Sequence, residues 1–262
     1  MKISSVCLKK RSEYEGKVYA THKYGALVVT KYINKDNVYV KFLETGYTTC
    51  STMRSIKKGN VKDRLSPILH GVGVLGECQS RIEGKPLKEY LVWKGILRRC
   101  YDTNYILRYP TYEGCEVSEN FKHFSFFKAW CNDQIGFGCL DDKGKVFQLD
   151  KDILVKGSKV YSEDICVFVP SEINNALIKS NKVRGELPIG VTFNTKVSKY
   201  MAYCSVGVGQ KTIGYYTTPE QAFYAYKQTK ESYIKEVANK WKDQIDPRVY
   251  NALMNYEVEI TD

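Results

Sequence analysis

The hydrophobic pattern near the start of the chain predicts short β-strands. Val38, Val40 and Phe42 alternate with Tyr39 and Lys41, and residues 26–32 are rich in β-branched side chains. Turn-forming residues at positions 23–25, 34–37 and 45–46 separate these strands into a meander. About 75 residues of this kind are most easily closed as a small barrel or a curled sheet. We therefore predict a β-barrel-like module over residues 1–75.

The pattern then changes to helical spacing and back again. Apolar side chains recur every three or four residues over 90–101, and a second helical run follows over 121–130. Residues 146–150 and 166–169 are typical of two strands joined through a turn at 156–159, and Pro170 favours the first turn of a helix. This order predicts a ββα module within residues 76–178, with Gly76–Lys88 as its connection to the first module.

The last third of the chain has the clearest pattern. Residues 190–194, 200–206 and 211–216 predict three short strands, and a helix capped by Thr217 or Thr218 follows. Its expected sheet-facing stripe is Ala222, Tyr226, Thr229, Tyr233, Val237 and Trp241. We predict a three-stranded sheet plus helix over residues 188–245, a polar linker over 179–187 before it, and an acidic tail over 246–262. The expected fold class is a multi-module α+β protein.

The net charge of +11 is unevenly distributed. Residues 1–75 carry +9, residues 76–178 carry −1, residues 179–245 carry +6 and residues 246–262 carry −3. Two basic modules around a near-neutral centre are expected if the outer modules neutralise phosphates. The basic edge of the first module suits phosphate contact or a solvated rim; it comprises Arg54, Lys57, Lys58, Lys62 and Arg64. The alternative is that lysine serves only as a solubilising residue.

Cysteine usage and hydropathy indicate the compartment. Nine cysteines, with no C-x-x-C pair, are typical of reduced thiols, and we expect no zinc site. No apolar run approaches the roughly 20 residues that span a bilayer, and the N-terminus has no signal-like apolar region. We expect a cytoplasmic protein, with a monomer favoured over an oligomer. We expect it to bind neither a membrane nor a small-molecule cofactor.

The last module resembles the DNA-binding domain of plant ethylene-response factors, the APETALA-type fold, which also occurs in phage homing endonucleases. The resemblance rests on Gly190-Val191, Tyr200-Met201-Ala202, Lys211-x-x-Gly214-Tyr215-Tyr216, Thr218-Pro219-Glu220-Gln221-Ala222 and Ala225-Tyr226. It implies that the sheet lies in the major groove of double-stranded DNA. The matching outward positions are Thr192, Asn194, Tyr203, Ser205 and Lys211, with Lys196 and Lys199 near phosphates. The Arg and Trp readers of the plant proteins are replaced, which leaves base preference open.

The centre is similar to phage H-N-H-type proteins over about Tyr90–Ala176. The similarity rests on residues 93–101, on Pro110-x-Tyr112-x-Gly114-x-x-Val117 with the aromatic residues after it, on residues 149–152, and on Tyr161-Ser162-x-x-x-Cys166 with Ile173-Asn174. It implies a phage or mobile-element DNA endonuclease, a homing-endonuclease-like hydrolase acting in the host cell. In that class a His activates a water molecule, an Asn orients that His, and one divalent metal stabilises the scissile phosphate.

The signature positions depart from that pattern. The expected His falls on Lys151, which suits phosphate contact better than proton abstraction, and the expected Asn falls on Ile165. Asp150 and Asp152, with Asn174 or the neighbouring Asn175, remain as possible Mg²⁺ ligands through oxygen. The alternative is that Asp150 caps a turn and Asp152 is solvated.

Three further residues of the centre are candidates. His123 is either a displaced catalytic base or a packed or surface residue. Arg98 and Arg99 lie on the polar side of the predicted helix, where they can contact DNA.

Two functions therefore compete: a metal-dependent DNA endonuclease, and a catalytically inactive sequence-specific DNA-binding protein that acts as a repressor, an architectural protein or a counter-defence protein. RNA binding is a more remote third class, because the many tyrosines permit stacking but no motif indicates it.

Overall fold

The computed structural model describes residues 11, 13–178, 186–207 and 209–262. The chain is a mixed α+β protein that forms two compact units. The first contains residues 1–113 and 119–128, and the second contains residues 114–118 and 129–262. The range 76–178, predicted as one module, thus contributes to both units. Most of the predicted linker over 179–187 lies outside the described residues.

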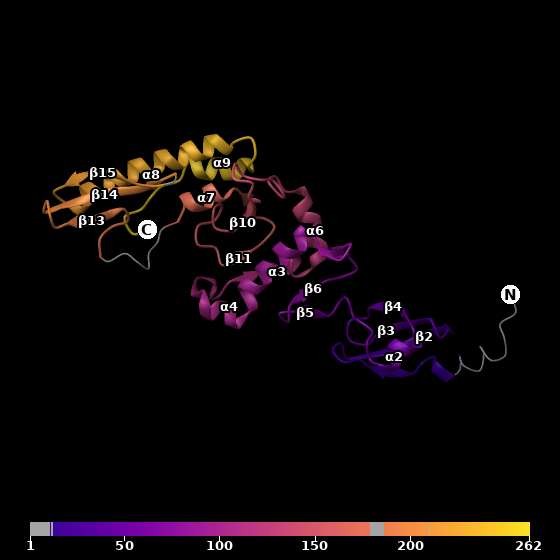
Figure 1. Ribbon diagram of the computed structural model, residues 1–262. Helices are drawn as coiled ribbons and strands as arrows, with labels where there is room; N and C mark the ends of the chain where they lie inside the picture. The colour runs from indigo at the N-terminus through magenta and orange to yellow at the C-terminus, as the bar shows by residue number, and fades with distance from the viewer. Residues whose placement is uncertain (1–10, 12, 179–185, 208) are drawn as a thin grey trace. The chain divides into compact units, whose positions relative to one another are not determined.

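The first unit begins with an antiparallel meander (Figure 1). Its strands are β1 (Val18–Ala20), β2 (Ala26–Asn34), β3 (Asn37–Phe42) and β4 (Thr48–Ser51), followed by the short helix α2 (Met53–Lys57). The predicted alternation holds in β3, where Val38, Val40 and Phe42 are fully buried. Met53 and Ile56 of α2 join the same core.

The predicted barrel is not closed. Within the part of the chain that the structure describes, the strand order is linear, β1-β2-β3-β4, so the first and last strands do not pair. Closure needs a continuous, tilted and staggered ladder, whereas β1 has three residues and β4 has four. Helix α2 contributes to the core in place of further strands.

Small strands and helices complete the first unit. β5 (Pro67–Leu69) pairs with β6 (Gly73–Val74), and β7 (Arg81–Ile82) pairs with β8 (Lys85–Pro86) inside the predicted connection. The helices are α3 (Lys88–Tyr101), α4 (Thr103–Arg108), the 3-10 turn η1 (Pro110–Tyr112) and α5 (Glu119–Lys122). Helix α6 (Phe124–Asp133) begins in this unit and ends in the second, because the boundary falls after Lys128. Trp93, Ile96 and Leu97 are buried on α3, as their spacing predicts. The Trp93 indole donates a hydrogen bond of 2.7 Å to the Phe121 carbonyl.

The second unit contains the predicted strand, turn, strand and helix order. β10 (Gln148–Asp150) pairs antiparallel with β12 (Val167–Val169), and α7 (Ser171–Ala176) follows directly. Between the two strands the chain forms β11 (Val160–Tyr161), which pairs in parallel with β9 (Glu116–Val117). The buried strand β12 and the buried Ile173 of α7 place this ββα segment in the core.

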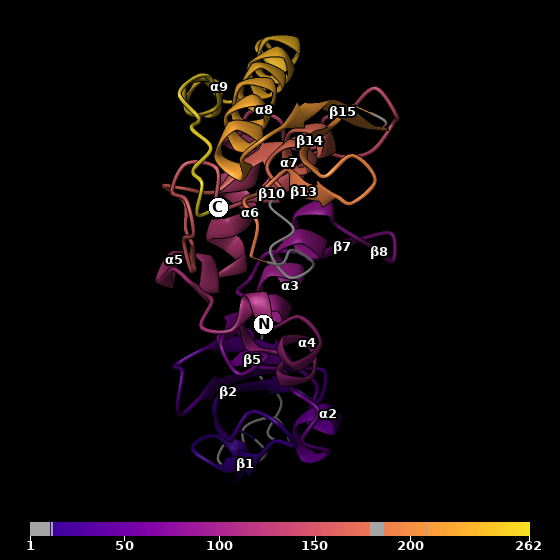
Figure 2. The ribbon, with the colours of Figure 1, turned by 90° about the vertical axis from the view of Figure 1, so that its left-hand side faces the viewer.

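A three-stranded sheet and a long helix form the rest of the second unit. The antiparallel sheet consists of β13 (Val191–Asn194), β14 (Lys199–Val206) and β15 (Gly209–Tyr216), with β14 in the middle. Helix α8 (Pro219–Trp241) packs along one face of this sheet, and α9 (Pro247–Met254) lies beside α8 (Figures 1 and 2). Thr218 caps α8 by accepting the Gln221 N–H.

The segment predicted as an acidic tail is folded. Val249 and Leu253 of α9 are buried, and so is Val258 beyond it. The segment therefore contributes apolar side chains to the second unit as well as its negative charge. Among the described residues, none of the helices combines the length and apolar character needed to cross a membrane.

Candidate nucleic-acid interface

The strand register decides which side chains point away from helix α8. Residues directly opposite each other in an antiparallel pair share a face of the sheet. Val191 lies opposite Ala202 and both are buried, so this pair faces α8. Alternation then places the next pair, Thr192 opposite Met201, on the other face. We call this second face the outer face.

The outer face is polar and aromatic. Its side chains, by the same register, are Thr192, Asn194, Lys199, Met201, Tyr203, Ser205, Gln210, Thr212 and Tyr215. Residues 187–219 contain three lysines and no Asp or Glu. The face can thus donate and accept hydrogen bonds while carrying no negative charge.

Lys211 does not lie on the outer face, although the sequence predicted it there. The register shifts between Ala202 and Tyr203, so Lys211 pairs with the buried Cys204 and shares its side of the sheet. The bulge occurs beside Ile213, whose side chain packs on the core under α8. An extra residue in one strand exchanges the faces of all residues beyond it. Lys211 is nevertheless exposed, at the α8 side of β15.

Two exposed lysines border the outer face at the β13–β14 turn. Asn194 accepts the backbone N–H of Lys196 at 3.0 Å, which orders the start of this turn. Ser198 closes the turn with a positive φ of 50°. Lys199 begins β14 opposite Asn194. The turn therefore presents Lys196 and Lys199 at one edge of the outer face.

A tight contact fixes the distance between sheet and helix. Gly190 precedes β13 with a φ of +74°, and a Cβ atom there would lie 2.1 Å from the Tyr226 ring. Only glycine combines that backbone conformation with so close an approach. The Tyr226 ring thus packs directly on the backbone where the sheet begins.

The carboxylates of the ββα segment lie at the end of β10. Asp150 accepts the backbone N–H groups of Asp152 and Ile153 at 2.7 and 2.9 Å, as a turn-capping aspartate does. Burial nevertheless raises the pKa of Asp150 above 3.8, because these hydrogen bonds offset only part of the desolvation. The contacts of Asp150 are therefore those of the alternative named above, in which Asp150 caps a turn.

Lys151 joins the two ends of the loop that follows β10 through hydrogen bonds. Its buried ammonium group is 2.7 Å from Asp152 Oδ1 and also donates to the Ser158 carbonyl. The same group lies 5.7 Å from the centre of the Tyr161 ring. With a carboxylate and a carbonyl as acceptors, Lys151 acts as a hydrogen-bond donor within the loop.

Asp150, Asp152 and Asn174 line one cavity of about 700 Å³ in the second unit. Asn174 donates to Gln148 Oε1 at 3.2 Å, and its own Oδ1 is buried with no hydrogen-bond partner among the described residues. The cavity is also lined by Glu257 and Glu259, which the sequence had placed in a tail.

These residues do not fit a complete magnesium site as they stand. Mg²⁺ demands near-octahedral oxygen coordination, yet the Asp152 carboxylate is paired with Lys151 and burial favours the neutral form of Asp150. In the ranges that the structure describes, no three His, Cys, Asp or Glu side chains are grouped closely enough to hold a metal. Burial also raises the pKa of the nearby Cys166 thiol to about 12, which disfavours its thiolate form.

His123, Arg98 and Arg99 belong to the first unit. His123 is exposed, and its backbone forms a bridge with Val74. The Arg98 guanidinium lies 4.8 Å from the centre of the Tyr105 ring and 3.7 Å from the Asp102 carboxylate. Arg99 lies 5.8 Å from the centre of the Tyr112 ring. The Arg98 guanidinium thus lies over a tyrosine ring of α4, and the Arg99 guanidinium over a tyrosine ring of η1.

No family model, curated protein or solved structure matches this chain.

The sequence interpretation missed two features of the second unit. Glu257 and Glu259 reach the Asp150 cavity because α9 returns the chain there, and local periodicity carries no signal for such a return. Glu172 of α7 accepts hydrogen bonds from Lys240 and from the Trp241 indole at 2.6 and 2.9 Å. These two contacts tie the ββα segment to the end of α8.

Proposed function

We propose that this chain is a sequence-specific binding protein for double-stranded DNA, and that the outer face of the β13–β15 sheet contacts base edges. The outer face carries the proposal, because it combines hydrogen-bonding and aromatic side chains with bordering lysines and contains no carboxylate. Strands lie about 4.8 Å apart, so three span roughly 10 Å between their outer axes. The major groove is about 12 Å wide.

The side chains of the outer face suit base readout. Asn194 and Gln210 each offer a carbonyl and an amide group, the pair that reads adenine. Thr192, Ser205 and Thr212 add hydroxyl groups, which contact several bases. Tyr203 lies at the centre of β14, where a bulky ring fills the space between the strands and the bases. Lys196 and Lys199 are placed to meet phosphates.

The register supplies a matched pair of variants for testing this surface. Lys199→Ala is expected to weaken binding to all duplexes and to lower the slope of log K against log salt by about 1, because one phosphate contact is lost. Lys211→Ala removes the same charge from the α8 side and is expected to leave the slope unchanged. Fluorescence anisotropy over a range of salt concentrations, with the full chain, measures both slopes. Equal effects of the two substitutions would contradict the assignment of the outer face.

Sequence preference tests the same face independently. Selection from a pool of random duplexes identifies the preferred site. Tyr203→Ala is then expected to reduce the ratio of specific to random-duplex affinity by about tenfold, while random-duplex binding changes little. A selection that enriches no sequence would contradict specific recognition.

Metal-dependent phosphodiester hydrolysis is a second candidate function. One observation favours it: Asp150, Asp152 and Asn174 share a cavity into which Asn174 brings an unpaired, buried acceptor. A plasmid-nicking assay with Mg²⁺ compares the wild-type chain with the double variant Asp150→Ala, Asp152→Ala, and with Asp243→Ala as a surface control. Nicking lost only in the double variant supports this function. Intact plasmid with the wild-type chain, under conditions where it binds the duplex, excludes it.

A further inference from the structure

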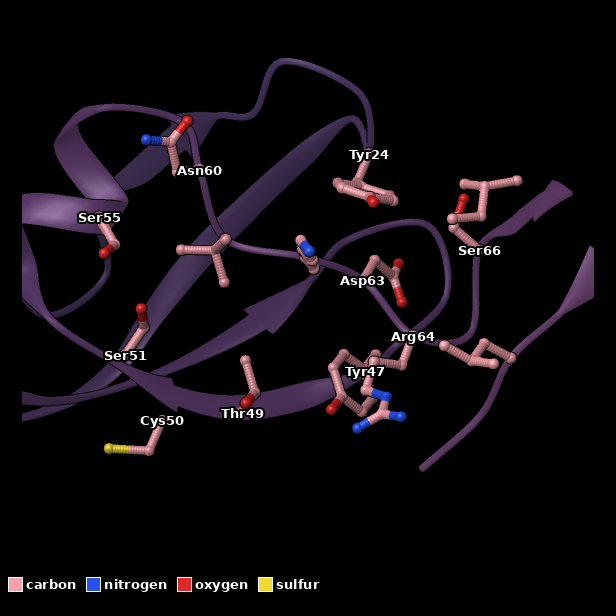
Figure 3. A pocket seen from close by; sticks show the side chains of 14 residues that line it. Tyr24, Tyr47, Thr49, Cys50, Ser51, Ser55, Asn60, Asp63, Arg64 and Ser66 are labelled. Atoms are coloured by element: carbon pink, nitrogen blue, oxygen red, sulfur yellow. The ribbon is translucent and has the colours of Figure 1, made fainter. Parts of the chain in front are cut away.

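A cavity of about 480 Å³ opens beside β4 in the first unit (Figure 3). Thr49, Cys50 and Ser51 follow one another along the strand on one side, and Tyr24 and Asn60 lie on the other. Three consecutive lining residues indicate that the cavity follows the free edge of the strand, because alternate residues of a strand point to opposite faces. Its volume lies in the range of small-ligand sites, roughly 300–1,000 Å³.

Two tyrosines that line this cavity from different sides are held by the core (Figure 3). Tyr24 packs edge-on against Phe42, with ring centroids 6.4 Å apart. Phe42 in turn stacks with Tyr47 at 6.1 Å, and both Phe42 and Tyr47 are buried. The two tyrosines therefore line the cavity in positions that the core sets, as a site for a flat ring requires.

Arg64 brings an unused donor to the same cavity. One of its terminal amino groups donates to the Cys78 carbonyl at 2.5 Å, which fixes the guanidinium group. Its Nε–H is buried and has no hydrogen-bond partner in the described part of the chain. A buried unsatisfied donor costs about 1–3 kcal/mol. A ligand acceptor that displaces the side chains covering this N–H would relieve that penalty. Asn60, Thr49 and Ser51 add amide and hydroxyl groups nearby.

The charges around the cavity argue against a bare anion. Asp63 lines it and is held in place, accepting the Thr45 hydroxyl at 2.5 Å and the Leu65 N–H at 2.8 Å. A carboxylate there repels a phosphate or carboxylate group and so offsets the attraction of the Arg64 guanidinium in the same lining. Lys62, by contrast, is exposed at its rim. The lining thus suits a flat, uncharged group with hydrogen-bond acceptors, attached to an anion that stays near the rim.

We propose that this cavity binds a single unpaired nucleotide. The base packs against Tyr24 and Tyr47 and accepts a hydrogen bond from Arg64 Nε, and its phosphate meets Lys62. This inference rests on the proposed DNA-binding function, and it adds that the first unit recognises a base outside the double helix. The excess of positive charge over residues 1–75 is consistent with a nucleic-acid ligand.

The test uses the full chain and two duplexes of one sequence, one fully paired and one with a single unpaired 2-aminopurine. The wild-type chain is expected to prefer the second duplex by about tenfold or more and to change its fluorescence on binding. Arg64→Lys keeps the charge but removes the Nε–H from the cavity, and Asn60→Ala removes an exposed amide. Each is expected to lower the preference several-fold, since a hydrogen bond contributes about 1 kcal/mol. Thr30→Ala, an exposed change on β2 outside the cavity, is the control.

Free ligands separate base from phosphate recognition. In saturation-transfer NMR, thymidine 5′-monophosphate is expected to bind and deoxyribose 5-phosphate is not. Equal binding of the two would overturn the base assignment in favour of a phosphate site. Tight duplex binding with no preference for the unpaired nucleotide, and no signal from thymidine 5′-monophosphate, would overturn this inference and leave the proposed function standing. If the wild-type chain binds neither duplex but still binds thymidine 5′-monophosphate, the proposed function is rejected instead.

Discussion

Two half-buried carboxyl groups in the second unit show how local contacts set protonation. Asp150 and Asp246 both accept backbone N–H groups, yet their pKa values move in opposite directions. Burial dominates at Asp150 and raises its pKa. At Asp246 the hydrogen bond from the Arg248 guanidinium dominates and lowers the pKa. The difference lies in the balance between desolvation, which is the largest effect at Asp150, and the charge-assisted hydrogen bond from Arg248, which is the largest effect at Asp246.

This contrast predicts opposite pH dependences of stability. With a folded pKa above 3.8, Asp150 binds its proton more tightly in the folded state, so its contribution is present below 3.8 and is lost as pH rises through the folded pKa. Asp246 has a lowered pKa, so its contribution is present above 3.8 and is lost as pH falls through the folded pKa. Asn at either position abolishes titration and retains an acceptor oxygen.

Urea denaturation at several pH values measures the effect. Relative to wild type, Asp150→Asn is expected to become more stable as pH rises from below 3.8 through the folded pKa of Asp150. Asp246→Asn is expected to lose stability over the interval in which wild-type Asp246 ionises. The same sign for both variants would contradict the environments described for these two carboxyl groups.

At the scale of elements, the pattern of apolar residues predicts strands and helices where alternation or spacing is regular. β3 alternates without exception, and the three strands of the outer-face sheet occur where expected. The stripe of α8 is only partly predicted, since Lys230 and Ile234 are buried in place of Thr229 and Tyr233. A lysine is rarely assigned to a core, although its aliphatic stem packs well there. Burial lowers the pKa of Lys230.

The outer face shows the limit of period-based prediction for the candidate site. Five predicted outward residues are Thr192, Asn194, Tyr203, Ser205 and Lys211, and the register places the first four on that face. Lys211 differs because one extra residue in β15 shifts the alternation. A bulge of this kind depends on how Ile213 and Gly214 pack against the opposite strand and α8. Gly214 inside β15 is the kind of residue that can mark a bulge, but the spacing of apolar residues does not locate it.

The contact between β13 and α8 yields a prediction with a matched control. Gly190→Ala places a Cβ atom 2.1 Å from the Tyr226 ring, at a φ of +74°. Gly207→Ala imposes a similar positive φ of +60°, but its Cβ has no neighbour within 4 Å. Left-handed backbone costs about 1–2 kcal/mol for a residue with a side chain, and forced overpacking adds about 1–3 kcal/mol.

Chemical denaturation of the full chain separates these terms. Gly207→Ala is expected to lower the free energy of unfolding by about 1 kcal/mol, and Gly190→Ala by roughly 3 kcal/mol or more. Duplex binding should persist in the Gly207 variant. Equal destabilisation by the two substitutions would show that the sheet and helix adjust to the added methyl group, and that their spacing is not set by this contact.

For the whole molecule, long-range contacts divide the chain in a way that composition did not indicate. Residues 114–118 and 119–128 are adjacent in sequence but belong to different units. The ββα segment shares its unit with the C-terminal sheet, through contacts such as that of Glu172 with the Trp241 indole. A strand of two residues such as β9 has no periodicity to detect, so its parallel partner β11 could not be found from local pattern.

Each of the two units carries its own exposed basic residues. Arg54 and Lys58 are exposed beside β4 in the first unit, and Lys196 and Lys199 border the outer face in the second. If both surfaces contact one duplex, neutralising either pair lowers the slope of log K against log salt by about 2, and neutralising both lowers it by about 4. Lys145→Gln, on an exposed residue of the near-neutral centre, serves as the control.

Additivity is the decisive outcome, since phosphate contacts release counterions independently. Should only the second pair change the slope, the first unit makes no backbone contact with the paired duplex, and its positive charge must serve another ligand. The unpaired-nucleotide substrate then distinguishes the two cases. If the first unit binds only an extruded base, neutralising Arg54 and Lys58 is expected to lower the slope of log K against log salt with that duplex alone. If these residues form only a solvated basic rim, neutralising them changes the slope with neither duplex.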